Sequence, residues 1–176
     1  MTPGETLRVP AALLQEVCRV LLPRYAAARR EPERMALLTT ACLERGAGSV
    51  AGDSHMPNGD RHGRAPADPF EQIARAVLLH GEPAGGTLFV TDTEHASDVL
   101  CALWLARRSG LFQPGSSTAE ASGKRSHLEI VPAFAARVSP EAAAAAMAGL
   151  YANAAFRRHL EARGRARMVA LAAAAA

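Results

Sequence analysis

The chain has 176 residues, of which 49% are hydrophobic and 21% charged, and its formal net charge is +3. This hydrophobic fraction is too high for a disordered chain and is sufficient for the core of one domain. No apolar run reaches the ~18 residues of a membrane span, and the start of the chain lacks the basic and apolar regions of a secretory signal. Three cysteines are too few for a disulfide framework. We therefore expect a soluble, cytoplasmic protein.

Alanine and arginine dominate the composition, with 39 alanines and 19 arginines against one lysine and two isoleucines. Both are good helix formers, so the bias favours helix. It is also typical of a GC-rich genome, and the basic pI of 9.1 therefore indicates little about partners. Only eight residues are aromatic, and no basic stripe is interleaved with them. This pattern argues against a nucleic-acid-binding protein.

The first part of the chain, residues 1–85, is predicted to be a helical segment. Apolar residues recur at three- and four-residue spacing over 7–28, which predicts a helix with one buried face, and Pro23 should kink or end it. A second helix is expected over 32–44, and a third over 69–80.

The stretch 46–68 between these helices is predicted to be a polar loop. It contains Asp53, His55, Asp60 and His62, which could be interpreted as a metal cluster. Their spacing matches no rigid ligand pattern, and flexible loops rarely preorganise a site. We favour a solvated loop.

The second part, residues 86–176, begins with a short apolar and β-prone run that predicts a buried strand over 87–91. A helix should follow over 95–109, with Asp92 and Thr93 as its candidate caps and Gly110 as its end. The following polar loop leads to a second predicted strand, 127–131, which Pro132 should end.

Two further helices and a strand are predicted in the remaining residues. Ser139 followed by proline and glutamate is a strong helix start, and Asn153 is a candidate cap for one more helix that Gly164 would end. Residues 167–171 have the composition of a third short strand.

Strands separated by helices usually lie parallel. We therefore predict an α/β fold, predominantly helical, in which 86–176 forms a βαβααβ slice of a (β/α) barrel and 1–85 adds helices. Asp92, Ala135 and Ala172 should lie near one end of the sheet. Leu88, Val90, Ile130 and Val131 should be buried, while part of the first helix stays exposed.

Two segments together resemble the phosphoenolpyruvate carboxylase family. Residues 89–100, FVTDTEHASDVL, and the later Gly110-Leu111 are similar to the family's "YVISM…SDVL…LLAKEAGL", and residues 130–134, IVPAF, to its "VVPLFET". Weaker agreement extends over 33–38 ("EER…LL") and 156–169 ("YRDHL…RQMVMLGYSDS"). The order and approximate spacing hold from residue 33 to the C-terminus.

The resemblance implies a mostly helical protein built round a (β/α)8 barrel. It also implies a carbon–carbon lyase of carbon fixation, which joins phosphoenolpyruvate and bicarbonate to give oxaloacetate and phosphate. In that family, Mg²⁺ or Mn²⁺ holds the substrate and stabilises the enolate, a role that requires hard oxygen ligands.

The sequence departs from the family where that chemistry lies. Ala135 aligns with the metal-binding glutamate of "LFET", and Ala175 aligns with the aspartate of "GYSDS". The histidine of "TAHPTE", the phosphate-binding arginines and the "FHGRGGS" loop have no counterpart. We therefore expect a truncated piece with no cofactor and no catalytic residues of its own, inactive alone.

Asp92 and Arg137 are the substrate-binding candidates, because both follow predicted strands where a barrel has its active-site rim. The plainer interpretations are a helix cap for Asp92 and a surface arginine for Arg137. We interpret the Ser97-Asp98 pair as structural. The three cysteines lie among apolar helical residues and should be buried hydrophobes. One of the scattered histidines should be a core residue.

Three hypotheses are open from the sequence. The chain is a piece of a phosphoenolpyruvate carboxylase homologue, a degenerate domain that acts by binding, or an unrelated α/β interaction module. Its partners by resemblance are phosphoenolpyruvate and bicarbonate, with self-association or pairing with another fragment as a further expectation, and with neither nucleic acid nor membrane.

Overall fold

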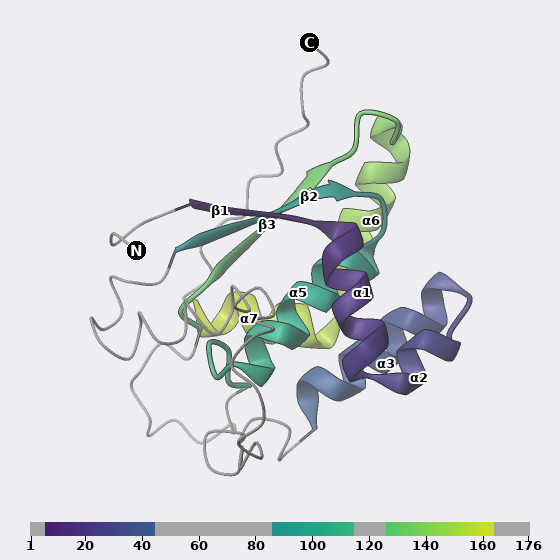
Figure 1. Ribbon diagram of the computed structural model, residues 1–176. Coiled ribbons are helices and arrows are strands. Elements are labelled where there is room, and N and C mark those ends of the chain that lie inside the picture. Colours follow the sequence, from purple (N-terminus) through teal and green to yellow (C-terminus); the bar gives the residue numbers. More distant parts are fainter. Residues whose placement is uncertain (1–5, 45–85, 115–125, 164–176) are drawn as a thin grey trace, which may run out of the picture.

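The computed structural model describes residues 6–44, 86–114 and 126–163, and it arranges them as a sheet with helices packed against it (Figure 1). The elements in chain order are β1 (Thr6–Pro10), α1 (Ala11–Leu21), α2 (Pro23–Ala27), α3 (Glu31–Leu43), β2 (Thr87–Thr93), α5 (Ala96–Arg108), β3 (Glu129–Phe134), α6 (Pro140–Ala152) and α7 (Ala154–Ala162). None of the helices in these ranges is long and apolar enough to cross a membrane.

The sheet has the order β1-β2-β3, and both pairs of neighbours are parallel. In the strand register, Leu7 of β1 lies opposite Leu88 of β2, and Leu88 lies opposite Ile130 of β3. Leu88, Val90 and Ile130 are fully buried and Val131 is nearly so, as predicted. The α/β class with three parallel strands is therefore confirmed.

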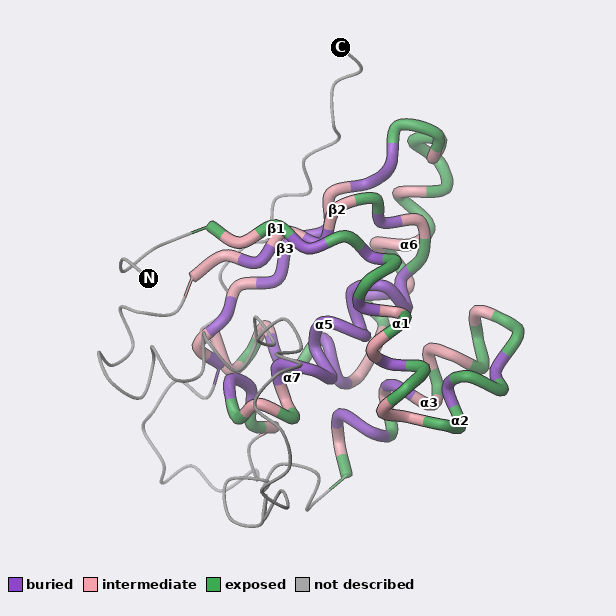
Figure 2. Tube along the Cα trace, in the orientation of Figure 1, coloured by how far each residue is buried: buried purple, intermediate pink, exposed green. Residues whose placement is uncertain are grey.

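The first strand was not predicted. The apolar spacing predicts a helix from residue 7, but Thr6–Pro10 form β1, and the helix begins at Ala11. In β1 Thr6, Arg8 and Pro10 are exposed while Val9 is buried, the alternation of a strand (Figure 2). The helix prediction was wrong here because the helical periodicity starts only after Pro10.

Several predicted elements lie outside the described residues. They are the loop 46–68, the helix 69–80, the end at Gly164 and the strand 167–171. The three observed strands therefore include two of the predicted ones together with β1, which comes from the segment 1–85 and pairs with β2.

Pro23 divides the first helical region as predicted. It occupies the first turn of α2, where a missing N–H costs no hydrogen bond, and α1 ends before it at Leu21. The helix α1 buries Leu14 and Cys18. On its outer side the side chains of Leu13 and Val20 are 47% and 73% exposed, so the predicted exposure of part of this helix is confirmed.

The helix α5 lies at the centre of the fold. Every residue from Ala96 to Ala106 is buried, because α1, α3 and β2 all pack against this helix. It ends where predicted, at Gly110, whose φ of +77° is readily adopted only by glycine.

The two predicted caps near the C-terminus are confirmed. The Ser139 hydroxyl accepts a hydrogen bond from the Ala142 amide at the start of α6 (3.2 Å). The Asn153 side chain accepts from the Ala155 and Phe156 amides at the start of α7. It also donates to the Thr39 hydroxyl (2.6 Å), which ties α7 to α3.

The strand β3 continues through Pro132 to Phe134, so the prediction that Pro132 ends it was wrong. Val90 pairs with Pro132, but the next matched residues are Thr93 and Phe134, so β2 carries one extra residue. Such a bulge accommodates a proline, which has no N–H to donate to the ladder.

Candidate functional site

The carboxyl ends of β2 and β3 meet at one edge of the sheet. The Ala135 amide, directly after β3, donates to the Thr93 carbonyl at the end of β2 (3.0 Å). Asp92 and Ala135 therefore lie near a common end, as predicted, whereas Ala172 is outside the described residues. In open parallel sheets ligands bind at this edge, so its side chains are the candidates for a site.

Asp92 lies in the bulge of β2. Its φ of +56° is left-handed, a conformation that aspartate tolerates better than most residues, and its side chain is exposed. The Thr93 hydroxyl donates to the Val90 carbonyl (2.7 Å). Neither residue caps the following helix, so the capping role predicted for them was wrong.

The start of α5 is capped by a residue of its own first turn and by a residue of α3. Asp98, fully buried, accepts hydrogen bonds from the Glu94 and His95 amides, each at 2.9 Å. Its second oxygen accepts from the Gln15 side chain of α1 (2.5 Å). Asp98 thus joins α1 to the start of α5.

A second carboxylate reaches the same helix end. Glu31 of α3 accepts from both the amide and the hydroxyl of Ser97, at 2.8 and 2.6 Å. The donors at the start of α5 that would suit a phosphate are therefore already bound to carboxylates of the chain. The structural role predicted for Ser97 and Asp98 agrees with these contacts.

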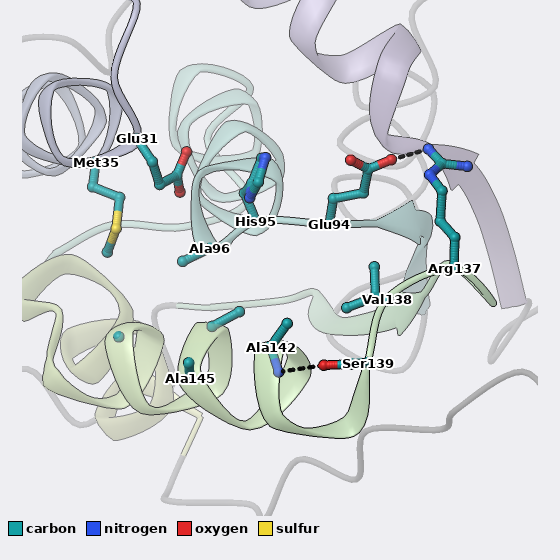
Figure 3. Close-up of a pocket in the computed structure, with 12 residues that line it drawn as sticks. Glu31, Met35, Glu94, His95, Ala96, Arg137, Val138, Ser139, Ala142 and Ala145 are labelled. Carbon is teal, nitrogen blue, oxygen red and sulfur yellow. Dashed lines mark hydrogen bonds and ion pairs between the residues drawn. The ribbon is translucent and has the colours of Figure 1, made fainter.

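Arg137 and Glu94 form an ion pair that bridges the loops after β2 and β3 (Figure 3). The Arg137 side chain is 71% exposed and that of Glu94 35%. An exposed pair of this kind contributes little to stability, but it neutralises the arginine that the sequence offered for a phosphate. The structure brings Arg137 to Glu94, and Asp92 makes no hydrogen bond or ion pair with either residue in the described parts of the chain.

A pocket of about 670 Å³ lies beside this ion pair, between α3, the start of α5 and α6 (Figure 3). Most of the residues that line it are small or apolar, and the charged or titratable ones are Glu31, Glu94, His95 and Arg137. Asp92 does not line it. The volume is in the usual range for small-molecule pockets.

The titratable groups of the core are structural. Burial lowers the pKa of His159 to about 3, so this histidine is neutral at pH 7, and its Nδ1 is 2.9 Å from the Ser126 hydroxyl. The hydrogen bond with Cys101, together with burial, raises the pKa of Cys18, and burial raises that of Cys42. All three thiols are buried, as predicted.

The comparison with known families decides the relationship. The sequence model of phosphoenolpyruvate carboxylase matches residues 9–172.

The chain belongs to the phosphoenolpyruvate carboxylase family.

Three curated relatives from Xanthomonas carry the name phosphoenolpyruvate carboxylase. The protein from X. euvesicatoria pv. vesicatoria (strain 85-10) is 33% identical over 123 residues, which are 69% of this chain and 13% of the relative. Those from X. campestris pv. campestris (strain 8004) and X. oryzae pv. oryzae (strain MAFF 311018) are 32% and 31% identical with the same coverage. The chain therefore spans about an eighth of the length of these relatives. No solved structure matches it significantly.

The residues at the sheet edge do not fit the divalent metal that the family implies. Ala135 presents a buried methyl group, and its amide and carbonyl are bonded to Thr93 and Val138. Glu94 is paired with Arg137. Within 6–44, 86–114 and 126–163, no three His, Cys, Asp or Glu side chains are grouped so that they could hold a metal ion. Ala175, the other aligned position, lies outside these ranges. A methyl group supplies no oxygen to Mg²⁺ or Mn²⁺.

The sequence indicated Arg137 but not the two acidic residues that line the pocket with it, Glu94 and Glu31. Glu94 is the first residue after β2 and Arg137 the third after β3, and this shared position in the loop after a strand was the available signal. Glu31 starts α3 and reaches Ser97 across 66 positions of the sequence, so no local pattern indicated the contact.

Proposed function

We propose that this chain is a segment of the barrel of a phosphoenolpyruvate carboxylase homologue and that it does not carboxylate phosphoenolpyruvate on its own. The observation that carries the proposal is Ala135, a buried alanine at the carboxyl end of β3 where the family has a metal-binding glutamate. The reaction requires stabilisation of an enolate, and loss of one preorganised stabiliser typically lowers the rate by ~10²–10³-fold.

The charges at the sheet edge support the same proposal. Glu31 binds Ser97, Asp98 binds the amides of Glu94 and His95, and Glu94 binds Arg137. Each of these four charged groups, Glu31, Asp98, Glu94 and Arg137, has a partner within the chain. Asp92 and Arg137 are the substrate-binding candidates, and binding of an anion at Arg137 would have to displace Glu94.

The test is an assay of oxaloacetate formation coupled to malate dehydrogenase, with phosphoenolpyruvate, bicarbonate and Mg²⁺ or Mn²⁺. We expect no turnover above a heat-killed control. Metal-dependent turnover by the unaltered chain would contradict the proposal, since the positions aligned with the metal ligands would then be irrelevant to the chemistry.

Calorimetric titration with Mn²⁺ tests the metal site itself. The Ala135→Glu, Ala175→Asp double variant should bind Mn²⁺ weakly, and it should still give no turnover, because the family's histidine and phosphate-binding arginines have no counterpart here. Ala136→Glu is the matched control, since Ala136 is exposed and adjacent. Equal binding by both variants would show that added charge, not position 135, is responsible.

A non-catalytic interaction role is the second candidate. It is favoured by Leu13 and Val20, which α1 exposes next to β1, the outermost strand among the residues that the structure describes.

A further inference from the structure

The ion pair between Glu94 and Arg137 lies at one end of the pocket beside the sheet edge. Both residues line that pocket, Glu94 from the loop after β2 and Arg137 from the loop after β3. Figure 3 shows their side chains directed at one another, with Glu31 at the opposite end of the row, beyond His95. The Glu94 carboxylate therefore occupies the guanidinium that would otherwise meet an incoming anion.

The backbone on both sides of this pair is fixed by hydrogen bonds. The Glu94 amide donates to the buried Asp98 carboxylate (2.9 Å). Arg137 lies in a turn that is closed by the Val138 amide, which donates to the Ala135 carbonyl (2.9 Å). Separation of the pair therefore requires the rotation of two side chains and no movement of a strand or helix.

The two side chains hold each other only weakly. The Arg137 side chain is mostly exposed and that of Glu94 is partly exposed. Water competes with the partner charge in such a pair, so it is readily exchanged. A competing anion must nevertheless approach Arg137 while a carboxylate of the same sign is beside it. Glu94 thus opposes an anion twice, because it occupies the guanidinium and repels the ligand.

Without the Glu94 charge, the surroundings of Arg137 suit a small oxyanion. A guanidinium presents paired N–H donors in a plane, the arrangement that binds phosphate with two parallel hydrogen bonds. The helix α6 begins at Pro140, three residues after Arg137, and the positive end of its dipole adds to the attraction. The other carboxylate in the pocket lining, Glu31, is bound to Ser97 on the α3 side.

We propose that Glu94 blocks a latent phosphate site at Arg137 and that its side chain must move aside before a phosphate binds there. The inference rests on the proposed function in one respect, that Arg137 is the residue which meets an anion. It concerns equilibrium binding without metal or bicarbonate. Turnover in the coupled assay would therefore contradict the proposed function and leave this inference standing.

The test is a calorimetric titration of the full chain with inorganic phosphate at constant ionic strength. Glu94→Gln keeps the size of the side chain and removes its charge. This variant should bind phosphate about tenfold more tightly than the unaltered chain, because both the competition and the repulsion are lost. Glu94→Ala provides a second removal of the carboxylate, and circular dichroism verifies the folding of both variants.

Two further variants identify the cause of the tighter binding. The double variant Glu94→Gln, Arg137→Gln should bind phosphate no better than the unaltered chain, because the guanidinium is absent. Glu161→Gln is the matched control for net charge, since Glu161 is exposed on α7 and does not line the pocket. It should leave the affinity within about twofold of the unaltered chain, because salt screens distant exposed charges.

Three results would overturn the proposal. The first is that neither Glu94 variant binds phosphate more tightly than the unaltered chain. The second is a gain in affinity that persists in the Arg137 double variant, which would place the phosphate elsewhere. The third is an equal gain from Glu161→Gln, which would assign the effect to net charge.

Discussion

The helices α5 and α6 occupy equivalent places in the topology but differ in almost every physical respect. Each has 13 residues, follows a parallel strand and begins at the carboxyl edge of the sheet. Yet α5 is buried from Ala96 to Ala106, whereas α6 has Leu150 as its single buried residue. The difference arises from neighbours, because α1 and α3 enclose α5, while α6 contacts α5 and α7. Position in a repeating topology therefore does not determine how much a helix contributes to the core.

The starts of the two helices differ in the same way. The amides of Glu94 and His95, just before α5, donate to Asp98, which also accepts from Gln15 of α1, and the Ser97 amide in the first turn donates to Glu31 of α3. The start of α6 is capped locally by Ser139. One helix is fixed by tertiary contacts and the other by its own sequence, so mutations should affect them unequally.

The largest expected effect is the removal of a core side chain from α5. Leu103→Ala should lower the free energy of unfolding by about 3–4 kcal/mol, because Leu103 is fully buried and its loss leaves a cavity. Met147→Ala in α6, which removes a half-buried side chain, should cost about 1 kcal/mol. Urea denaturation of both variants measures the contrast. Equal losses would mean that α6 is as well packed as α5.

A smaller effect is expected from the acidic residues in the first turns. Asp98→Ala should cost about 2–3 kcal/mol, since the buried Asp98 carboxylate accepts from the amides of Glu94 and His95 and from the Gln15 side chain, and its loss leaves all three without this acceptor. Glu141→Ala at the start of α6 should change stability little, because Glu141 is fully exposed. The same denaturation series compares the two, and a neutral Asp98 variant would show that the network is dispensable.

The pH dependence should give the smallest of the three effects. The pKa of His159 is lowered to about 3 in the folded chain, whereas an unfolded histidine titrates near 6.5, so the unfolded state binds the proton first. Stability should therefore fall as the pH drops below 6.5, by about 2 kcal/mol at pH 5, and continue to fall towards pH 3.

The variant His159→Phe isolates this contribution. Phenylalanine keeps an aromatic ring beside Phe112 and Phe156 but does not titrate. The difference in unfolding free energy between pH 7 and pH 5 should shrink by about 2 kcal/mol relative to the unaltered chain. An unchanged difference would mean that His159 is protonated without cost or that it titrates near its usual pKa.

Sequence predicted those features that depend on residues close together in the chain. The caps at Ser139 and Asn153, the stop at Gly110 and the buried strand after Gly86 all follow from local chemistry, and each was found. The strand Thr6–Pro10 was missed because five alternating residues adjoin a longer helical periodicity. Its strand state depends on pairing with β2, about 80 positions away, which no local pattern reports.

The candidate site was predictable only in outline. The edge of the sheet and Arg137 could be inferred from the order of strands, because parallel strands place their following loops together. The pairing of Arg137 with Glu94 and of Glu31 with Ser97 depends on how loops and helices pack. The division of the chain at residue 85 and the roles of Asp92 and Arg137 stay predictions.

The unequal burial of α5 and α6 also explains where the compositional bias of this chain accumulates. α6 carries a run of five alanines, Ala142–Ala146, most of them exposed. Alanine costs an exposed helix nothing in propensity, so a genome that drifts towards alanine codons can rewrite such a surface freely. The same drift is blocked in α5, where Leu100, Leu103 and Trp104 fill the space between the sheet and two helices. Between these two helices, alanine is therefore commoner in the one whose side chains face solvent.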